Sequence, residues 1–152
     1  MLNEAHAERV WFRLLRLQTR LDLAVSARLK ALGLSIPQCD VLTTLTEREG
    51  VSQQELAKRL YVTKGNISGL LDRLATSGLV ERRSIPSDRR SHAIFLTAAG
   101  RVLAQQGIAI QNKFVAETLA RLPISDLAKF EDLLIATRDL VRSATADPPA
   151  RA

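Results

Sequence analysis

One stretch, residues 52–97, constrains the fold of this chain more than any other. It begins SQQELAKRLYVTKGNISGLLDRL and ends VERRSIPSDRRSHAIFLT, so two short helical patterns joined by a tight turn lead into a charged hairpin. Ser52 precedes Glu55 by three residues, which predicts an N-cap with a capping box, and Thr63 is the expected cap of the second helix. The pattern predicts a helix-turn-helix followed by a β-wing, a device that holds one helix in a DNA major groove.

Long amphipathic helices are predicted on both sides of this stretch. Apolar residues recur at steps of three and four over residues 4–32 and again near the C-terminus, as on the buried face of a helix. The expected fold is mainly α with a small β-wing, in which residues 34–97 form a winged helix-turn-helix core. Residues 1–33 and 98–145 are predicted to be helical dimerisation regions, because they carry more apolar surface than one small core needs. Residues 146–152 are expected to be a frayed tail.

The boundaries of the shorter elements follow from turn and capping residues. The helix before residues 52–97 is expected to begin at a Ser35 cap and to end at Gly50. Residues 79–84 and 92–96 are predicted to be short strands. The residues between them, 85–91, include a proline and an aspartate, which favours a loop over a continued strand.

The start of the second helix holds side chains that suit DNA contact. Lys64 can bond guanine or a phosphate, and Asn66 has the paired donor and acceptor that suit adenine. Thr63 and Ser68 have hydroxyls for phosphate oxygens, which the positive end of the helix dipole also attracts. Together with two arginines of the wing, the predicted DNA-contacting set is Thr63, Lys64, Gly65, Asn66, Ser68, Arg73, Arg89 and Arg90.

The hairpin is predicted to supply a second set of DNA contacts. Arg89 and Arg90 near its tip can enter a minor groove, whose negative potential attracts guanidinium groups. Asp88 would repel phosphate, so we expect it to stabilise the wing by pairing with an arginine such as Arg82, Arg83 or Arg90. The alternative is a solvated charged loop without a partner.

Two glycines in the second helix leave two interpretations open. Gly65 and Gly69 lie four residues apart, hence on one face, and each costs a helix about 1 kcal/mol relative to alanine. A missing side chain lets another backbone come close. The approaching group is either DNA or the preceding helix, and the pattern does not distinguish them.

Charge and rare residues exclude several classes of protein. The net charge of +6 fits an anionic partner. Cys39 is the only cysteine, and His6 and His92 are the only histidines, so no zinc-ligand spacing exists and no metal or cofactor is expected. No run of about 18 apolar residues occurs, and the N-terminus does not resemble a signal peptide, so a cytoplasmic protein without a membrane partner is predicted.

An enzymatic function is not expected. Ser87, Asp88 and His92 contain the residue types of a hydrolytic triad. They lie within one short loop, without a strand-to-helix elbow or an evident oxyanion hole, so we discount catalysis.

Three segments resemble the MarR family of bacterial regulators. They are VTKGNISGLLDRLATSGLVER, PSDRRSHAIFLTAAG and LGLSIPQCDVL, which resemble the recognition helix, the wing and the opening of the second helix of that family. The resemblance covers residues 32–101 closely. It implies an obligate, triangular homodimer that binds a short inverted repeat in double-stranded DNA. It also implies repression of nearby genes, with release by a small ligand or an oxidant.

The resemblance also implies roles for single residues. It puts Lys64, Asn66 and Ser68 in the major groove. Arg89 falls at the wing position that reaches the minor groove, and Asp88 at the position that stabilises the wing.

The signal that controls such a regulator is left with two candidates. The resemblance implies a pocket for a ligand of the aromatic acid or acyl thioester type. Trp11 lies among arginines that include Arg16, and a ring beside guanidinium groups would suit such a ligand. Trp11 packing at a dimer interface is the simpler interpretation. Cys39 is the third residue of the predicted effector pocket, after Trp11 and Arg16. A thiol-based redox regulator or activator that uses Cys39 is the alternative, although a buried, inert cysteine fits its surroundings better.

Overall fold

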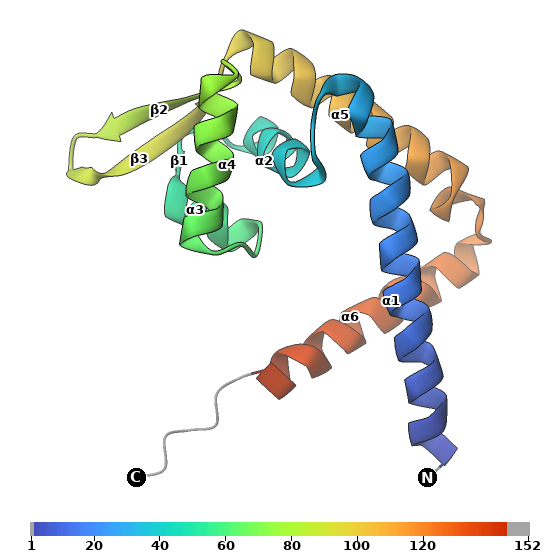
Figure 1. The fold of residues 1–152 in the computed structure, drawn as a ribbon. Coiled ribbons are helices and arrows are strands. Elements are labelled where there is room, and N and C mark those ends of the chain that lie inside the picture. The colour runs from blue at the N-terminus through green and yellow to red at the C-terminus, as the bar shows by residue number, and fades with distance from the viewer. Residues whose placement is uncertain (1, 146–152) are drawn as a thin grey trace, which may run out of the picture. The chain divides into compact units, whose positions relative to one another are not determined.

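The computed structural model describes residues 2–145, apart from the side chains of Leu2 and Arg89. The tail of residues 146–152, for which fraying is predicted, lies outside the described residues. The fold is mainly helical with a small antiparallel sheet, so the predicted fold class is confirmed (Figure 1). The chain divides into two compact units, Met1–Gln111 and Asn112–Ala152, and the boundary falls inside helix α5 (Ala98–Glu117).

The N-terminal helix ends as predicted. Helix α1 (Leu2–Leu29) continues into a short 3-10 turn, η1 (Lys30–Leu32). Gly33 follows with φ of 68°, and its N–H donates to the Lys30 carbonyl at 3.0 Å. Glycine reaches this left-handed conformation without a steric penalty, which explains why the helix stops there.

Helix α2 (Ile36–Glu47) begins as predicted but ends earlier. Ser35 is its cap, and the Ser35 and Gln38 side chains each accept from the other residue's backbone N–H. The expected end at Gly50 is wrong by three residues. Gly50 has φ of 76°, and its N–H donates to the Ile94 carbonyl at 2.8 Å, so this glycine leads into the sheet.

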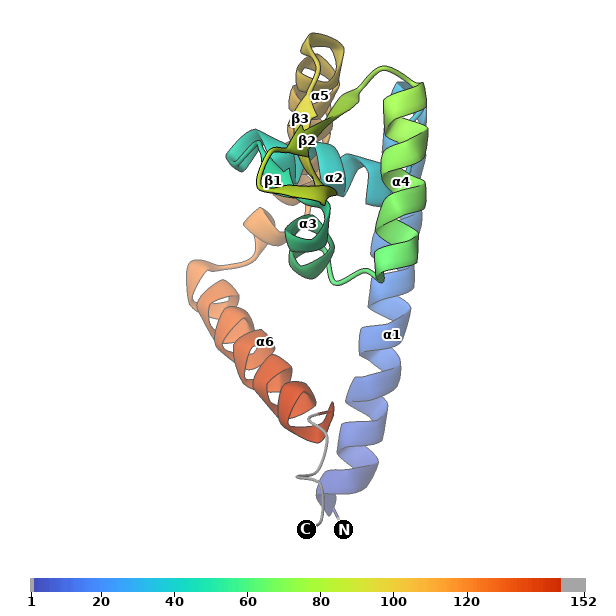
Figure 2. The same ribbon diagram turned by 90° about the vertical axis from the view of Figure 1, so that its left-hand side faces the viewer.

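The sheet contains a strand that the sequence does not predict. Strand β1 (Val51–Ser52) pairs antiparallel with β3 (Asp88–Leu96), which also pairs with β2 (Val80–Ile85), giving the order β1-β3-β2. The predicted loop over residues 85–91 is wrong, because β3 already begins at Asp88 and only residues 86–87 form the turn. The proline lies in that turn, where its missing N–H costs no bond of the ladder. Figure 2 shows the tip of the hairpin toward the viewer, with α3 below it and α4 to one side.

The helix-turn-helix follows the predicted caps. Helix α3 (Gln53–Arg59) is capped by Ser52, whose Oγ accepts from the Glu55 N–H at 3.0 Å. The reciprocal half of the expected capping box is replaced, because the Glu55 carboxylate accepts from the Arg59 guanidinium at 3.0 Å instead. Helix α4 (Lys64–Thr76) then begins after a cap at Thr63.

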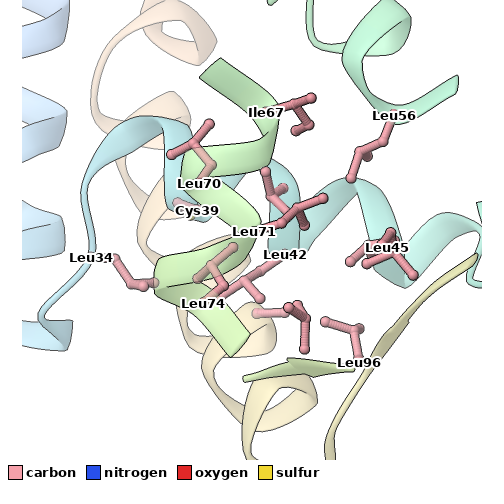
Figure 3. Packing of buried hydrophobic residues seen from close by; sticks show 14 of the residues in the cluster. Leu34, Cys39, Leu42, Leu45, Leu56, Ile67, Leu70, Leu71, Leu74 and Leu96 are labelled. Atoms are coloured by element: carbon pink, nitrogen blue, oxygen red, sulfur yellow. The ribbon is translucent and has the colours of Figure 1, made fainter. Parts of the chain in front are cut away.

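One hydrophobic core holds the first unit together. The inner face of α4 is buried as predicted, and it packs with leucines of α2 and α3 and with the ends of β2 and β3 (Figure 3). Burying a leucine or isoleucine side chain contributes about 1.5–3 kcal/mol. The fully covered members of this core include Leu42, Leu45, Leu56, Ile67, Leu71, Leu74 and Ile94.

The second unit has no buried residue within its long helix. After η2 (Leu119–Arg121), helix α6 (Ile124–Thr145) carries exposed apolar side chains at Leu133, Leu134, Leu140 and Val141. Over residues 2–145, none of the helices is both long and apolar enough to cross a bilayer.

Candidate nucleic-acid interface

Helix α4 exposes its first turn. The Thr63 Oγ1 accepts from the Asn66 N–H at 3.2 Å, so this hydroxyl caps the first turn of the helix. Further along, Ser68 is half-buried and Arg73 is exposed. An exposed helix N-terminus with free backbone N–H groups and a positive dipole end suits an anion such as a phosphate. Three side chains and one bare Cα face solvent at this end, those of Thr63, Lys64, Asn66 and Gly65.

The two glycines of α4 do not pack against the preceding helix. A Cβ atom added to Gly65 would have no heavy atom within 4 Å, and one added to Gly69 would meet only the Arg73 Nη1 at 3.7 Å. Helix-to-helix packing, one of the two interpretations left open by the sequence, is therefore wrong for these positions. The face of Gly65 and Gly69 is open to an outside partner.

The wing is stabilised at its tip by Asp88, although not through an arginine guanidinium. Its carboxylate accepts from the Ser91 hydroxyl at 2.6 Å and from the Arg90 backbone N–H at 3.0 Å. These two hydrogen bonds, that of Ser91 first, lower the pKa of Asp88 below its usual value. Arg90 is exposed at the start of β3, and the Arg89 side chain is outside the described part of the structure.

Arg83, on the first strand of the wing, contacts two neighbouring side chains. Arg83 donates to the Glu81 carboxylate at 3.1 Å, and its guanidinium lies 4.1 Å from the centre of the Phe95 ring. Both Arg83 and Glu81 are exposed. Such surface pairs contribute little to stability, but here they keep one arginine of the wing engaged with its own strand.

A pocket of about 610 Å³ lies between α3, the start of α4 and β3. Three of its lining residues are cationic and come from three different elements: Lys58, Lys64 and Arg90. A concave surface with one sign of charge concentrates the field and attracts anions. The other lining residues are Ser52, Gln53, Gln54, Ala57, Tyr61, Val62, Ile67, Ser91 and His92.

Tyr61 occupies the turn between α3 and α4 in an unusual conformation. Its φ is 53°, and 89% of its surface is exposed. A residue other than glycine in this left-handed region costs of order 1–2 kcal/mol. The tyrosine therefore holds a ring with a hydroxyl at the rim of the pocket at some cost to the turn.

The structure does not bring the three predicted effector residues together. Trp11 and Arg16 are exposed on α1, whereas Cys39 is fully buried in the core of the winged helix. Burial first, and then the nearby Asp40 carboxylate, raises the pKa of the Cys39 thiol. A Cβ added to Gly107 would come 2.7 Å from the Cys39 Sγ, so the thiol is packed tightly against α5. A covered thiol with a raised pKa is a poor nucleophile.

Several residues of this surface are not predicted by the sequence. Lys58, Tyr61 and His92 line the pocket, but none of them belongs to the predicted DNA-contacting set. Lys58 is at the end of α3, and its proximity to the wing depends on long-range packing of the sheet. The only local signal for Lys58 in the sequence is that it lies a few residues before the start of α4.

The family model that matches this chain is described as MarR family and covers residues 34–92. A curated HTH-type transcriptional repressor of Mycobacterium tuberculosis is 36% identical over 110 residues, which is 72% of this chain and 79% of that protein. The HTH-type transcriptional regulator TtmR of Methylorubrum extorquens is 44% identical over 70 residues, which is 46% of this chain and 36% of that protein.

Solved structures similar to this one include two complexes with DNA. The transcriptional repressor CouR bound to a 23-mer DNA duplex has a TM-score of 0.77 and 28% identity, covering 90% of this chain and 96% of that one. A mutant MarR from E. coli complexed with operator DNA has a TM-score of 0.74 and 28% identity, covering 82% of this chain and 91% of that one.

Proposed function

Since this chain belongs to the MarR family of DNA-binding transcriptional regulators, we propose that it is a homodimeric repressor of nearby genes. Each subunit inserts α4 into a major groove and places its wing against the adjacent minor groove. The two recognition helices lie one turn of DNA apart, about 34 Å, so the operator is an inverted repeat. A small ligand releases the protein from DNA.

The observation that carries this proposal is the shared basic surface of α4 and the wing. Lys64 and Asn66 lie on the exposed first turn of α4, and Lys64 lines one pocket with Arg90 of the wing. In the proposed complex the DNA backbone runs over this pocket, between the groove that α4 reads and the groove that the wing enters. Asn66 and Lys64 then contact base edges, whereas Ser68 and Arg73 contact the backbone, and Arg89 and Arg90 enter the minor groove.

The proposed dimer accounts for exposed apolar side chains. Val10, Leu14, Leu17 and Leu21 recur along α1 and are each more than a third exposed, and α6 carries a second exposed apolar set. Contiguous apolar surface of this kind marks an interaction site in soluble proteins. A second copy of the chain would bury both sets, which supports assigning residues 1–33 and 98–145 to dimerisation.

The proposed regulation by a ligand rests on two side chains of α1. Trp11 offers an exposed aromatic surface and Arg16 an exposed guanidinium on the same helix, and these residue types suit an aromatic acid or an acyl thioester. A ligand that prefers a dimer with another spacing of the α4 helices lowers DNA affinity by its difference in affinity for the two states.

The test begins with selection of bound sequences from a random duplex pool. Fluorescence anisotropy then compares the wild type with Lys64→Ala, Asn66→Ala, Arg89→Ala and Arg90→Ala. Loss of a good base contact costs about 1–3 kcal/mol, or roughly five- to 150-fold in Kd, and relaxes the preference at one position. Lys129→Ala removes the same charge from α6 and is the matched control, with no expected effect.

Salt and size measurements complete the test. Binding through phosphates should fall steeply between about 50 and 200 mM salt, whereas an apolar protein contact would change little. Unchanged affinity in all four variants would remove the proposed reading surface. Sedimentation that shows only monomer at micromolar concentration would contradict the dimer.

A further inference from the structure

We propose that Arg82 is a positioning residue that holds the wing in register with the recognition helix. The inference rests on the proposed DNA-reading roles of α4 and the wing. Arg82 lies in β2, the strand that joins α4 to the tip of the hairpin. Its Nη1 donates to the Asp72 Oδ1 at 2.5 Å, and its Nη2 donates to the Ser68 carbonyl at 3.1 Å.

The two acceptors lie side by side on α4. Ser68 and Asp72 are separated by four residues, and a helical carbonyl points toward the residue four positions on, so a single guanidinium reaches both the Ser68 carbonyl and the Asp72 carboxylate. Arginine suits this arrangement because its donors form a rigid planar fork, whereas the ammonium of lysine is a single point of attachment. Arg82 therefore fixes both the distance and the orientation of β2 relative to α4.

The burial of Arg82 separates it from the other arginines of the wing. Its side chain is 24% exposed, compared with 60% for that of Arg83 on the same strand. The Arg82 Nε is buried and has no hydrogen-bond partner among the described residues. An unpaired buried N–H is unfavourable, so the two contacts with α4 must offset this cost to hold the side chain here.

The contact joins the two elements that the proposed function needs together. Ser68, whose carbonyl accepts from Arg82, belongs to the predicted major-groove set, and Arg82 pairs with Ile94 of β3, the strand that carries Arg90 nearer the tip. Without the bridge, the hairpin can twist relative to α4. DNA binding would then have to order the wing, and the entropic cost of this ordering would weaken the affinity for DNA.

The experiment measures DNA affinity by anisotropy on the selected operator, using the full chain. Arg82→Ala is expected to weaken binding about tenfold or more, and Asp72→Asn is expected to weaken it in the same direction, because loss of preorganisation appears in Kd. Arg83→Ala is the matched control, since it removes the same charge from the same strand without touching α4. It is expected to change Kd by no more than about twofold, as for a surface charge.

A double-mutant cycle separates positioning from folding. Arg90→Ala should cost less in the Arg82→Ala background than in the wild type, because a misplaced wing has little contact to lose. Adding Asp72→Asn to Arg82→Ala should cause no further loss. Thermal unfolding verifies that each variant is folded, and Asp72→Asn, at a side chain that is 62% exposed, carries the test if Arg82→Ala does not fold.

The outcomes distinguish this inference from the proposed function. Equal losses for Arg82→Ala and Arg83→Ala, or an Arg90→Ala penalty that is the same in both backgrounds, would overturn the positioning role while leaving DNA reading intact. A wild-type protein that selects no duplex sequence would overturn the proposed function, and the positioning role with it.

Discussion

Replacement of Gly69 by alanine should stabilise the protein and weaken its binding to DNA. Gly69 lies in the middle of α4 and does not have a positive φ. A Cβ atom added to it would have only the Arg73 Nη1 nearby, at 3.7 Å. Alanine fits this site in ordinary van der Waals contact and gains the helix propensity that glycine lacks. The expected gain in the free energy of unfolding is about 0.5–1 kcal/mol. For a chain of this length, each kcal/mol raises Tm by roughly 2–4 °C.

The effect on DNA has the opposite sign. In the proposed complex the duplex approaches the bare backbone at Gly65 and Gly69, so an added methyl group overpacks the contact. Overpacking of a fitted surface costs about 1–3 kcal/mol, which corresponds to about five- to 150-fold in Kd. Gly65→Ala should behave alike, with a smaller gain in stability because Gly65 lies in the first turn of the helix.

Thermal unfolding and operator anisotropy on the same preparations provide the assay. Gly100→Ala is the contrasting variant, because a Cβ there would come 1.9 Å from the Leu79 carbonyl oxygen and must destabilise the fold. If Gly69→Ala raises Tm and leaves Kd unchanged, the open glycine face points to solvent in the complex and the argument is refuted. If Gly69→Ala lowers Tm, the description of this site as open is wrong.

Two further predictions concern titratable groups. The Glu49 carboxylate accepts from the Leu96 N–H at 2.8 Å and from Arg101, and these bonds, that of Leu96 first, lower its pKa. The ionised Glu49 therefore stabilises the folded state fully above the unfolded pKa and loses this effect as pH falls toward the folded pKa. The urea-midpoint difference between wild type and Glu49→Gln should accordingly shrink as pH falls below about 4.3. A constant difference down to pH 3 would contradict this. Cys39 should react with a thiol reagent only after unfolding, and peroxide should leave DNA binding unchanged, because the thiol is buried and its pKa is raised. Rapid labelling of the native protein, or release from DNA that Cys39→Ser abolishes, would restore the redox alternative.

The local elements of this fold were predictable because their signals lie within a few residues of one another. The Ser35, Ser52 and Thr63 caps and the stop at Gly33 all form as expected. Each depends on one side chain and the backbone of the next turn, so neighbouring sequence is sufficient to specify it.

The elements that were missed depend on residues distant in the chain. Strand β1 has two residues and exists only because β3 pairs with it, about forty residues later. The Glu55 carboxylate accepts from Arg59 in place of the expected capping bond. Arg82 pairs with Asp72 and not with Asp88. A charged residue offers several partners of equal chemistry, and tertiary packing decides among them.

The order β1-β3-β2 leaves both outer strands of the sheet open to other chains. Unpaired strand edges invite edge-to-edge aggregation, and proteins prevent it with very short strands and with charged side chains. Here β1 has only two residues, and β2 carries Glu81, Arg82 and Arg83 in succession. Short and charged edges of this kind disfavour the recruitment of a strand from a neighbouring copy, so the sheet is protected from edge-to-edge aggregation.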